Sequence, residues 1–478
     1  MARKAFSILI IFILVILIPL RTLTLRADTA MTAQEQVNAM SVGWNLGNTL
    51  DSYGTWISNV TPQAVETAWG NPVTTRLMIA SVKAQGFNTI RIPVTWAQFT
   101  DSQGNVDPQW MARVREVVDW SLEEGLYVIL NVHHDTGEHG QDKVCWMIAD
   151  MGTYNSVESR YAGLWTSIAN EFKDYDDRLM FEGYNELLDM NNSWNAATSG
   201  SGAYDAVNSY AQAFVDTVRA TGGNNATRNL IVNTYVASTD QAVRSAFVLP
   251  QDTVEDHLIC EVHAYTPWQF CSSEGDSSYT SFDSNCQNAI DELMSTVDSF
   301  SDSLGVPVII GEFGVENQNN DSDRVAYTSY YVQKAAEYGI RCIWWDNGIS
   351  GYGGYGILDR NALTWNQDMV SALADNAPSG TPASADPIQE ISETEAEETE
   401  QTVAVIIETS QQQDNVVEAT AESSEAVIAS ETQEPSNSQN INGNKDYFTI
   451  LLIVGIPIVL ASYVGLFFLG RRSGRKTR

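Results

Sequence analysis

The amino-acid sequence predicts a (β/α)₈ barrel, also called a TIM barrel, over about residues 31–377. Short apolar runs alternate with amphipathic stretches of helical length from Ser41 to about Asp375. Eight strand–helix units in this block match the count and size of such a barrel. A doubly wound open sheet is the alternative, but no glycine-rich phosphate loop follows the first strand. The α/β barrel is therefore the favoured fold.

Each expected strand is a short run of β-branched, aliphatic or aromatic residues. The eight runs are Val42–Leu46, Thr89–Val94, Tyr127–Val132, Leu179–Asn185, Asn229–Thr234, Leu258–Ala264, Val306–Gly311 and Ile340–Trp345. The expected helices include Thr74–Gln85, Pro108–Glu124, Val157–Asp174, Tyr204–Ala220, Asn288–Ser303 and Asp323–Tyr338. Gly86, Gly125 and Gly339 follow three of these helices, where a left-handed cap is expected, and each comes just before a strand.

The N-terminal residues 1–30 have the pattern of a signal peptide. Two basic residues precede an uncharged apolar run from Phe6 to Leu20, which is short for a membrane span. Cleavage is expected near Ala27 or Ala30. Because neither site is a clean small-x-small match, an uncleaved anchor stays open as the alternative.

The C-terminal segments predict a spacer, a membrane span and a basic tail. Residues 378–446 are rich in Ser, Thr, Glu and Gln, a composition typical of a disordered acidic linker. Residues 447–469 carry no charge and are long enough to cross a bilayer as a transmembrane helix. Five basic residues lie in the tail 470–478, which the positive-inside rule places in the cytoplasm. We therefore expect an exported body held on the extracellular face of the cell membrane.

Charge and cysteine content restrict the partners and the environment. The formal net charge is −34, and most of it lies in the central block. So acidic a body repels nucleic acid and anionic lipid head groups, which leaves neutral or cationic substrates, although acidity also keeps secreted proteins soluble. Of the five cysteines, Cys260 and Cys342 fall in strand-like runs and are expected to be buried thiols. Cys271 and Cys286 share one predicted loop, and an exported location would allow them to pair.

Two glutamates occupy the positions that carry chemistry in a barrel. Glu186 ends the run Phe-Glu-Gly-Tyr-Asn-Glu, and Glu312 lies in Val-Ile-Ile-Gly-Glu-Phe-Gly. A strand that ends in a glutamate places its charge at the rim of the sheet, and two such carboxyls face to face can cleave a glycosidic bond. A lone glutamate at a strand end is usually only solvated, so the inference rests on the pair together with its neighbours.

Further polar and aromatic residues stand at the ends of the predicted strands, where barrel enzymes place their sites. Arg91 is a charge inside an apolar run, and a buried arginine needs a carboxylate partner. The other strand ends carry Asn131, His133, His134, Asp135, Asn185, His263, Tyr265, Trp344, Trp345, Asp346 and Asn347. Their convergence on one end of the barrel is hard to explain by packing alone.

A metal centre is the rival interpretation of one stretch. Residues 133–139, His-His-Asp-Thr-Gly-Glu-His, offer ligands for zinc or iron, but the spacing fits no closed zinc motif. Adjacent His133 and His134 on a strand would point to opposite sides, so both would not easily reach one ion. We therefore expect no metal and no other cofactor.

Eight short motifs resemble glycoside hydrolase family 5, and most closely its bacterial endo-β-1,4-glucanases. They are Gly-Trp-Asn-Leu-Gly-Asn-Thr-Leu-Asp (43–51), Trp-Gly-Asn-Pro (69–72), Gly-Phe-Asn-Thr-Ile-Arg-Ile-Pro-Val-Thr-Trp (86–96), Asn-Val-His-His-Asp (131–135), Tyr-Asn-Glu (184–186), Val-His-Ala-Tyr (262–265), Ile-Ile-Gly-Glu-Phe-Gly (309–314) and Trp-Trp-Asp-Asn-Gly (344–348). The resemblance covers about residues 35–375. Ala264 is one departure, since many relatives carry a larger residue between the histidine and the tyrosine.

The resemblance implies roles for individual residues. Glu186 would be the acid/base and Glu312 the nucleophile of a retaining double displacement, with the two carboxyls about 5–5.5 Å apart. The supporting residues it implies are Arg91 and Tyr265 on Glu312, His263 near Glu186, Asn185 on the sugar 2-hydroxyl, His133 and His134 as sugar contacts, and Trp345 as an aromatic platform. For the acid role, partial burial and the nearby Glu312 charge must keep Glu186 protonated.

These observations predict a retaining endo-β-1,4-glucanase that cleaves internal bonds of cellulose-type glucans. Its expected partners are a β-glucan and, through the C-terminal helix, the membrane, but no nucleic acid, and its catalytic domain is expected to be monomeric. Xyloglucan, mixed-linkage glucan, mannan or xylan stay open as substrates, because related barrels share the catalytic residues and differ in their loops. A non-catalytic glycan-binding surface protein is the alternative from another class. Trp146, Trp194 and Trp268 could lengthen the glycan cleft, or they could simply pack.

Overall fold

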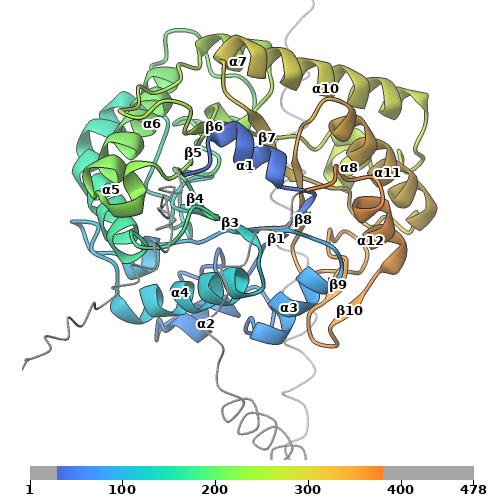
Figure 1. The fold of residues 1–478 in the computed structure, drawn as a ribbon, viewed down its shortest axis with the longest axis horizontal. Coiled ribbons are helices and arrows are strands. Elements are labelled where there is room, and N and C mark those ends of the chain that lie inside the picture. Colours follow the sequence, from blue (N-terminus) through green and yellow to red (C-terminus); the bar gives the residue numbers. More distant parts are fainter. Residues whose placement is uncertain (1–29, 381–478) are drawn as a thin grey trace, which may run out of the picture. The chain divides into compact units, whose positions relative to one another are not determined.

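The computed structural model describes residues 30–380, which form a ring of eight parallel strands surrounded by helices (Figure 1). The strands follow one another around a closed barrel in chain order. They are β1 (Gly43–Leu46), β2 (Thr89–Ile92), β3 (Tyr127–Asn131), β4 (Leu179–Glu182), β5 (Leu230–Asn233), β6 (Leu258–His263), β7 (Val308–Phe313) and β8 (Cys342–Asp346). The predicted (β/α)₈ barrel and the position of all eight predicted strands are confirmed.

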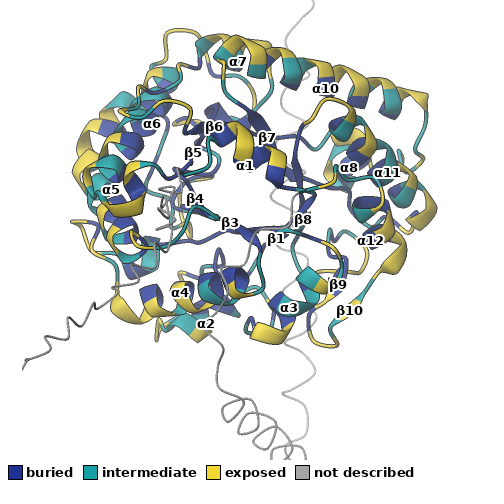
Figure 2. Cartoon of the chain, viewed as in Figure 1, coloured by how far each residue is buried: buried dark blue, intermediate teal, exposed yellow. Residues whose placement is uncertain are grey.

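Helices cover the outside of the barrel, with exposed outer faces and buried inner faces (Figure 2). The large ones are α3 (Arg76–Ala84), α4 (Pro108–Glu123), α5 (Met151–Glu171), α6 (Ala203–Ala220), α10 (Ser284–Leu304) and α11 (Asp321–Glu337), which confirm the six predicted helices. Gly86, Gly125 and Gly339 follow α3, α4 and α11 with φ of 93°, 70° and 72°, the left-handed conformation expected of them.

Several short elements were absent from the sequence prediction. They are α1 (Ala33–Ala39), α2 (Pro62–Glu66), α7 (Gln241–Ala246), α8 (Trp268–Cys271), α9 (Ser273–Asp276), α12 (Gln367–Ala374), the hairpin β9 (Leu358–Asp359) and β10 (Thr364–Trp365), and the 3₁₀ turns Ala97–Phe99, Gly223–Ala226 and Tyr235–Ala237. Segments this short show few repeats of an apolar pattern, and helices of this length form only where the rest of the fold supports them.

Helix α1 closes the N-terminal end of the barrel, where Figure 1 shows it across the ring of strands. Its residues Ala33 and Val37 belong to one buried cluster with isoleucines from inside the barrel, among them Ile129, Ile259 and Ile309. A capping box at Thr32 starts the helix. Because this end of the barrel is apolar and covered, the polar interior residues lie toward the opposite, C-terminal end.

Other predictions concern the cysteines and the two ends of the chain. Cys260 and Cys342 are buried thiols, as expected. The suggested Cys271–Cys286 bridge is wrong, since both are free and each thiol contacts a tyrosine hydroxyl, that of Tyr327 or Tyr279. The predicted signal peptide (1–30), linker (378–446), transmembrane helix (447–469) and tail (470–478) fall almost wholly outside the described residues. Between residues 30 and 380, no helix is long and apolar enough to span a membrane.

Candidate active site

The two predicted catalytic glutamates come together at the C-terminal end of the barrel. Glu312 lies inside β7, one residue before its end, whereas Glu186 lies four residues beyond the end of β4. The expectation that Glu186 is itself a strand end is therefore wrong, because β4 stops at Glu182 and the chain continues in an irregular path. Carboxylate oxygens of Glu186 and Glu312 nevertheless lie within 4.8 Å of each other. This separation falls on the short, retaining side of the two carboxyl spacings known for glycosidases, about 5–5.5 Å and about 6.5–9.5 Å.

Arg91 on β2 is fully buried and organises the site. Its Nη1 donates to Glu312 Oε1 at 2.7 Å and to the side-chain oxygen of Asn45 at 3.0 Å. Its Nη2 donates to Asn185 Oδ1 at 2.8 Å and to Glu182 Oε1 at 2.8 Å, while Nε donates to Glu182 Oε2 at 2.6 Å. All five N–H groups of the guanidinium are thus used, which meets the condition for burying an arginine.

Two buried carboxylates in this network were not singled out from the sequence. Glu182 on β4 makes the bidentate pair with Arg91, and Glu261 on β6 lies 3.4 Å from its Nε. Burial raises the pKa of Glu182, and the charge of Arg91 opposes that rise. The signal was present, since each is a charged residue inside an apolar run and Glu261 stands two residues before His263, on the same face of the strand.

The Glu312 carboxyl is held from two sides. Its Oε1 accepts from Arg91, and its Oε2 accepts the hydroxyl of Tyr265 at 2.9 Å. Burial raises the pKa of Glu312, and the positive charges of His263 and Arg91 oppose the rise. Both contacts favour the ionised form, which is the form that can attack a sugar.

His263 bridges the catalytic carboxylates. Its Nδ1 lies 2.7 Å from Glu186 Oε1 and 3.7 Å from Glu312 Oε2, while its Nε2 lies 3.2 Å from Glu261 Oε1. Burial acts to lower the pKa of His263, but the charges of Glu312 and Glu186 outweigh it and raise the pKa to about 10. The stabilisation from this imidazolium is therefore full below about pH 6.5 and is lost as the pH rises toward 10.

The rings of His133 and His134 lie beside each other, with 4.6 Å between their centroids, and the expectation that they point to opposite sides is wrong. They lie beyond the end of β3, so strand alternation does not apply, and their ligand nitrogens fall within 4.8 Å of an oxygen of Asp51. His139, in contrast, stands apart in a loop held by Asn192. The run 133–139 therefore does not converge as a whole.

Burial favours the neutral form of both histidines. Burial lowers the pKa of His133 and that of His134, the latter to about 3. Asn131 Nδ2 donates to the carboxylate of Glu182 at 3.1 Å and lies 3.0 Å from His133 Nδ1, so Nδ1 accepts and Nε2 carries the proton. The Nε2–H of His133 is the donor that this ring can offer to a sugar hydroxyl.

Asn185 and Trp345 complete the predicted set. Because Asn185 Oδ1 accepts from Arg91, the NH₂ group of its amide supplies the donors that a sugar hydroxyl needs. The ring of Trp345 at the end of β8 is partly exposed and lies parallel to the ring of His133, with 5.8 Å between their centroids and 5° between their planes. An aromatic face of this kind can pack against the apolar face of a pyranose.

Gly47 provides the room for Trp345. A Cβ at position 47 would lie 2.7 Å from the indole ring and 2.8 Å from the backbone oxygen of Asp346. We expect Gly47→Ala to tilt the indole ring of Trp345. Trp345→Ala removes the ring, and we expect it to raise KM for a glucan by about tenfold with a smaller change in kcat. Initial-rate kinetics measure this, with Trp345→Phe as the control that keeps an aromatic face. A fall in kcat alone at unchanged KM would contradict the platform role.

Some strand-end residues prove structural. Trp344 is fully buried, and Asp346 pairs with Arg360 at 3.0 Å beneath the loop that follows β8. Trp146 also packs, with its Nε1 on Asp135 at 2.6 Å and Arg160 over its ring. Trp268, by contrast, is 44 % exposed and stands beside Tyr265, and Trp194 is 51 % exposed.

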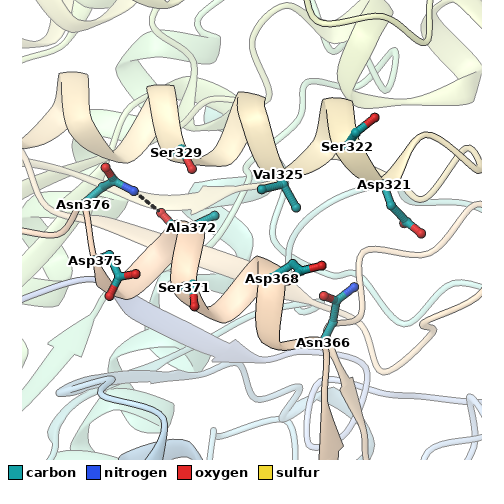
Figure 3. A pocket seen from close by; sticks show the side chains of 10 residues that line it. All are labelled: Asp321, Ser322, Val325, Ser329, Asn366, Asp368, Ser371, Ala372, Asp375 and Asn376. Atoms are coloured by element: carbon teal, nitrogen blue, oxygen red, sulfur yellow. Dashed lines mark hydrogen bonds between the residues drawn. The ribbon is translucent and has the colours of Figure 1, made fainter.

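A groove on the outside of the barrel lies away from this chemistry. Figure 3 shows it between α11 and α12, lined by Asp321, Asp368 and Asp375, by serine and asparagine side chains, and by Val325 and Ala372. Its lining includes neither of the catalytic glutamates and no basic side chain. The site at the C-terminal end of the strands is therefore the candidate active site.

A closed (β/α)₈ barrel with two close carboxyls at the C-terminal ends of its strands defines a glycoside hydrolase of the retaining class. The family model described as Cellulase (glycosyl hydrolase family 5) matches residues 50–351. The chain belongs to this family.

The relatives match nearly three quarters of the chain. Endoglucanase A of Clostridium longisporum is 41 % identical over 360 residues, which are 73 % of this chain and 67 % of that one. A solved GH5-4 broad specificity endoglucanase from Ruminococcus champanellensis with bound cellotriose is 41 % identical, with a TM-score of 0.68 over 72 % of this chain and 99 % of that one. A family 5 enzyme from Prevotella bryantii in complex with a xyloglucan tetradecasaccharide is 38 % identical, with a TM-score of 0.66 over 73 % and 99 %.

Proposed function

We propose that this chain is a retaining endo-β-1,4-glucanase that hydrolyses internal bonds of cellulose-type glucans. The observation that carries the proposal is the pair of carboxyls, Glu186 and Glu312, within 4.8 Å of each other at the C-terminal end of the barrel. Arg91, Tyr265 and His263 all contact this pair, as a working site requires. A non-catalytic glycan-binding protein would not need such a network.

The reaction proceeds in two displacements. A carboxylate oxygen of Glu312 attacks the anomeric carbon while Glu186 gives its proton to the departing glycosidic oxygen, so a glycosyl ester forms and the shortened chain leaves as an alcohol. A water molecule then attacks the same carbon, Glu186 takes one of its protons, and Glu312 leaves as a carboxylate. Two inversions at one carbon give net retention. Glu186 ends protonated, ready for the next cycle.

The test uses the purified chain and a soluble cellulose derivative. We expect release of reducing ends together with a rapid fall in viscosity, which marks internal cleavage, and NMR should show the β-anomer as the first product. The activity should resist a chelator, since the scheme uses no metal. Equal release of reducing ends by wild type and Glu312→Gln would refute the proposal.

The acid/base role of Glu186 predicts a dependence on the leaving group. General acid catalysis contributes about 10²–10⁴-fold, so Glu186→Gln should lose that much activity on a glucan, whose leaving alcohol needs a proton. On an aryl cellobioside with an acidic phenol the first step should survive, and a burst of phenol should precede slow turnover. Stopped-flow absorbance measures the burst. Equal losses on both substrates would contradict the assignment.

The range of substrates follows from the exposed aromatics of the loops. Trp194 and Trp268 are exposed, and their aromatic faces can extend the sugar-binding surface. The xyloglucan complex of the Prevotella bryantii relative supports including branched glucans as a second substrate class. A panel of cellulose derivative, xyloglucan, mixed-linkage glucan, mannan and xylan, with sizing of the products, ranks them.

We further propose that the enzyme is exported and anchored to the membrane at its C-terminus. The support is the sequence alone: the apolar run near the N-terminus, the uncharged stretch 447–469 and the basic residues after it. Expression of the full chain and of a chain ending at residue 446 tests this. Activity that stays with washed membranes only for the full chain is the expected result, and equal distribution of both would contradict it.

A further inference from the structure

A third carboxylate, Glu261, lies beneath the catalytic pair and takes no part in the scheme above. It is completely buried on β6. Its Oε1 lies 3.2 Å from His263 Nε2 and 3.4 Å from Arg91 Nε, and its Oε2 has no hydrogen-bond partner within residues 30–380. Burying a carboxylate with one unsatisfied oxygen costs stability, so a compensating role is expected.

The neighbouring strand makes room for this side chain. A Cβ at Gly311 on β7 would lie 1.9 Å from Glu261 Oε1 and 2.2 Å from its carboxyl carbon. The pairing of β6 and β7 also shifts between Val262 and His263, which brings His263 opposite Glu312. A glycine at 311 is thus needed for the carboxylate of Glu261 to occupy its place under the histidine.

The position of Glu261 affects the protonation of the His263 ring. Glu186 faces its Nδ1 and Glu261 faces its Nε2. Once Glu186 has given its proton to the leaving group it is a carboxylate like Glu261, and an ionised carboxylate only accepts hydrogen bonds. A neutral imidazole has one N–H and can satisfy only one of these two acceptors, whereas an imidazolium satisfies both. The other charged or titratable groups around the ring are Glu312 and Tyr265, and, at longer range, the cation Arg91 and the neutral His133.

We propose that Glu261 is a positioning residue that holds His263 from below as a doubly protonated imidazolium whose Nδ1–H points at Glu186. This inference rests on the proposed function, because its effect is on the proton of Glu186. A fixed imidazolium donates to Glu186 and cannot take its proton, so that proton remains for the glycosidic oxygen. It also stabilises the Glu186 carboxylate that forms once the proton has gone.

The experiment compares Glu261→Gln with Glu182→Gln in the full chain. Glu182 is a matched control, since it is equally buried and also pairs with Arg91 but makes no hydrogen bond to His263. The chain has five histidines, so selective ¹⁵N-histidine labelling resolves their ring nitrogens, with His263→Asn to assign the signal. The readouts are the titration of His263 without substrate and the basic limb of kcat/KM against pH.

We expect Glu261→Gln to move the His263 titration and the basic limb down together by about one pH unit or more, and Glu182→Gln to move them less than half as far. Equal shifts in the two variants, or no shift in Glu261→Gln, would overturn the proposal. Should Glu261→Gln fail to fold, Gly311→Ala, which displaces the same carboxylate, is expected to give the same shift. The titration needs no substrate, so an inactive wild type with the expected titration would refute the proposed function and leave the positioning role standing.

Discussion

Replacing Glu312 by glutamine is expected to abolish glucan hydrolysis, with kcat falling by about 10³-fold or more. An amide cannot form the glycosyl ester, and the donors of Arg91 and Tyr265 that now stabilise a carboxylate would face a neutral group. The variant should still bind substrate, because no sugar-binding contact is removed. Initial rates on a soluble cellulose derivative and calorimetric titration with cellotetraose measure the two quantities.

The covalent step gives a second, independent readout. A 2-deoxy-2-fluoro cellobioside with a good leaving group should label the wild type, because the fluorine slows hydrolysis of the ester more than its formation. Mass spectrometry of peptides should place the label on Glu312. Glu312→Gln should stay unlabelled, and Glu186→Gln should still accept the label. A label on another residue would contradict the assignment of the nucleophile.

Replacing Arg91 by methionine should cause the largest loss of stability. Removing one partner of a buried ion pair costs about 3–5 kcal/mol, because the remaining charge stays buried without compensation. Here three carboxylates, those of Glu182, Glu261 and Glu312, lose their shared cation. Activity should vanish as well, since Glu312 and Asn185 both lose a contact that holds them. Denaturant unfolding at pH 7 measures the free energy.

Arg115→Met is the matched control for this change. Arg115 pairs with Glu171 at 2.7 Å on the surface, with 48 % and 29 % of their side chains exposed, and such pairs contribute at most about 1 kcal/mol. The deficit of Arg91→Met should shrink as the pH falls. Without Arg91 the raised pKa values of Glu182 and Glu312 rise further, and protonation then removes the uncompensated charge. Similar losses in the two variants, or a deficit that grows on acidification, would contradict the central role of Arg91.

The sequence by itself determined the barrel and the reactive pair. Alternation of apolar strands with amphipathic helices follows from the local periods of strand and helix, and glycine caps mark where three of the helices stop, so these features need no knowledge of the fold. The motifs around Arg91, Glu186, His263 and Glu312 could also be recognised as candidate site residues from the sequence, because a charged residue in an apolar run is unusual wherever it occurs. Helix α1 could not be predicted from the sequence, because seven residues show too few repeats of an apolar pattern and the helix depends on the end of the barrel that it covers.

Only the tertiary structure decided how the polar residues divide between chemistry and support. In the sequence, Trp344, Trp345 and Asp346 all stand at the end of the same strand and cannot be told apart by position. In the structure Asp346 pairs with Arg360, Trp344 is buried and Trp345 faces the site. The sequence likewise left the role of Glu261 open, because that role depends on the space left by Gly311 on another strand. The physical reason is that a carboxylate's proton affinity and an aromatic ring's exposure are set by neighbours brought together through space, and chain position alone does not specify those neighbours.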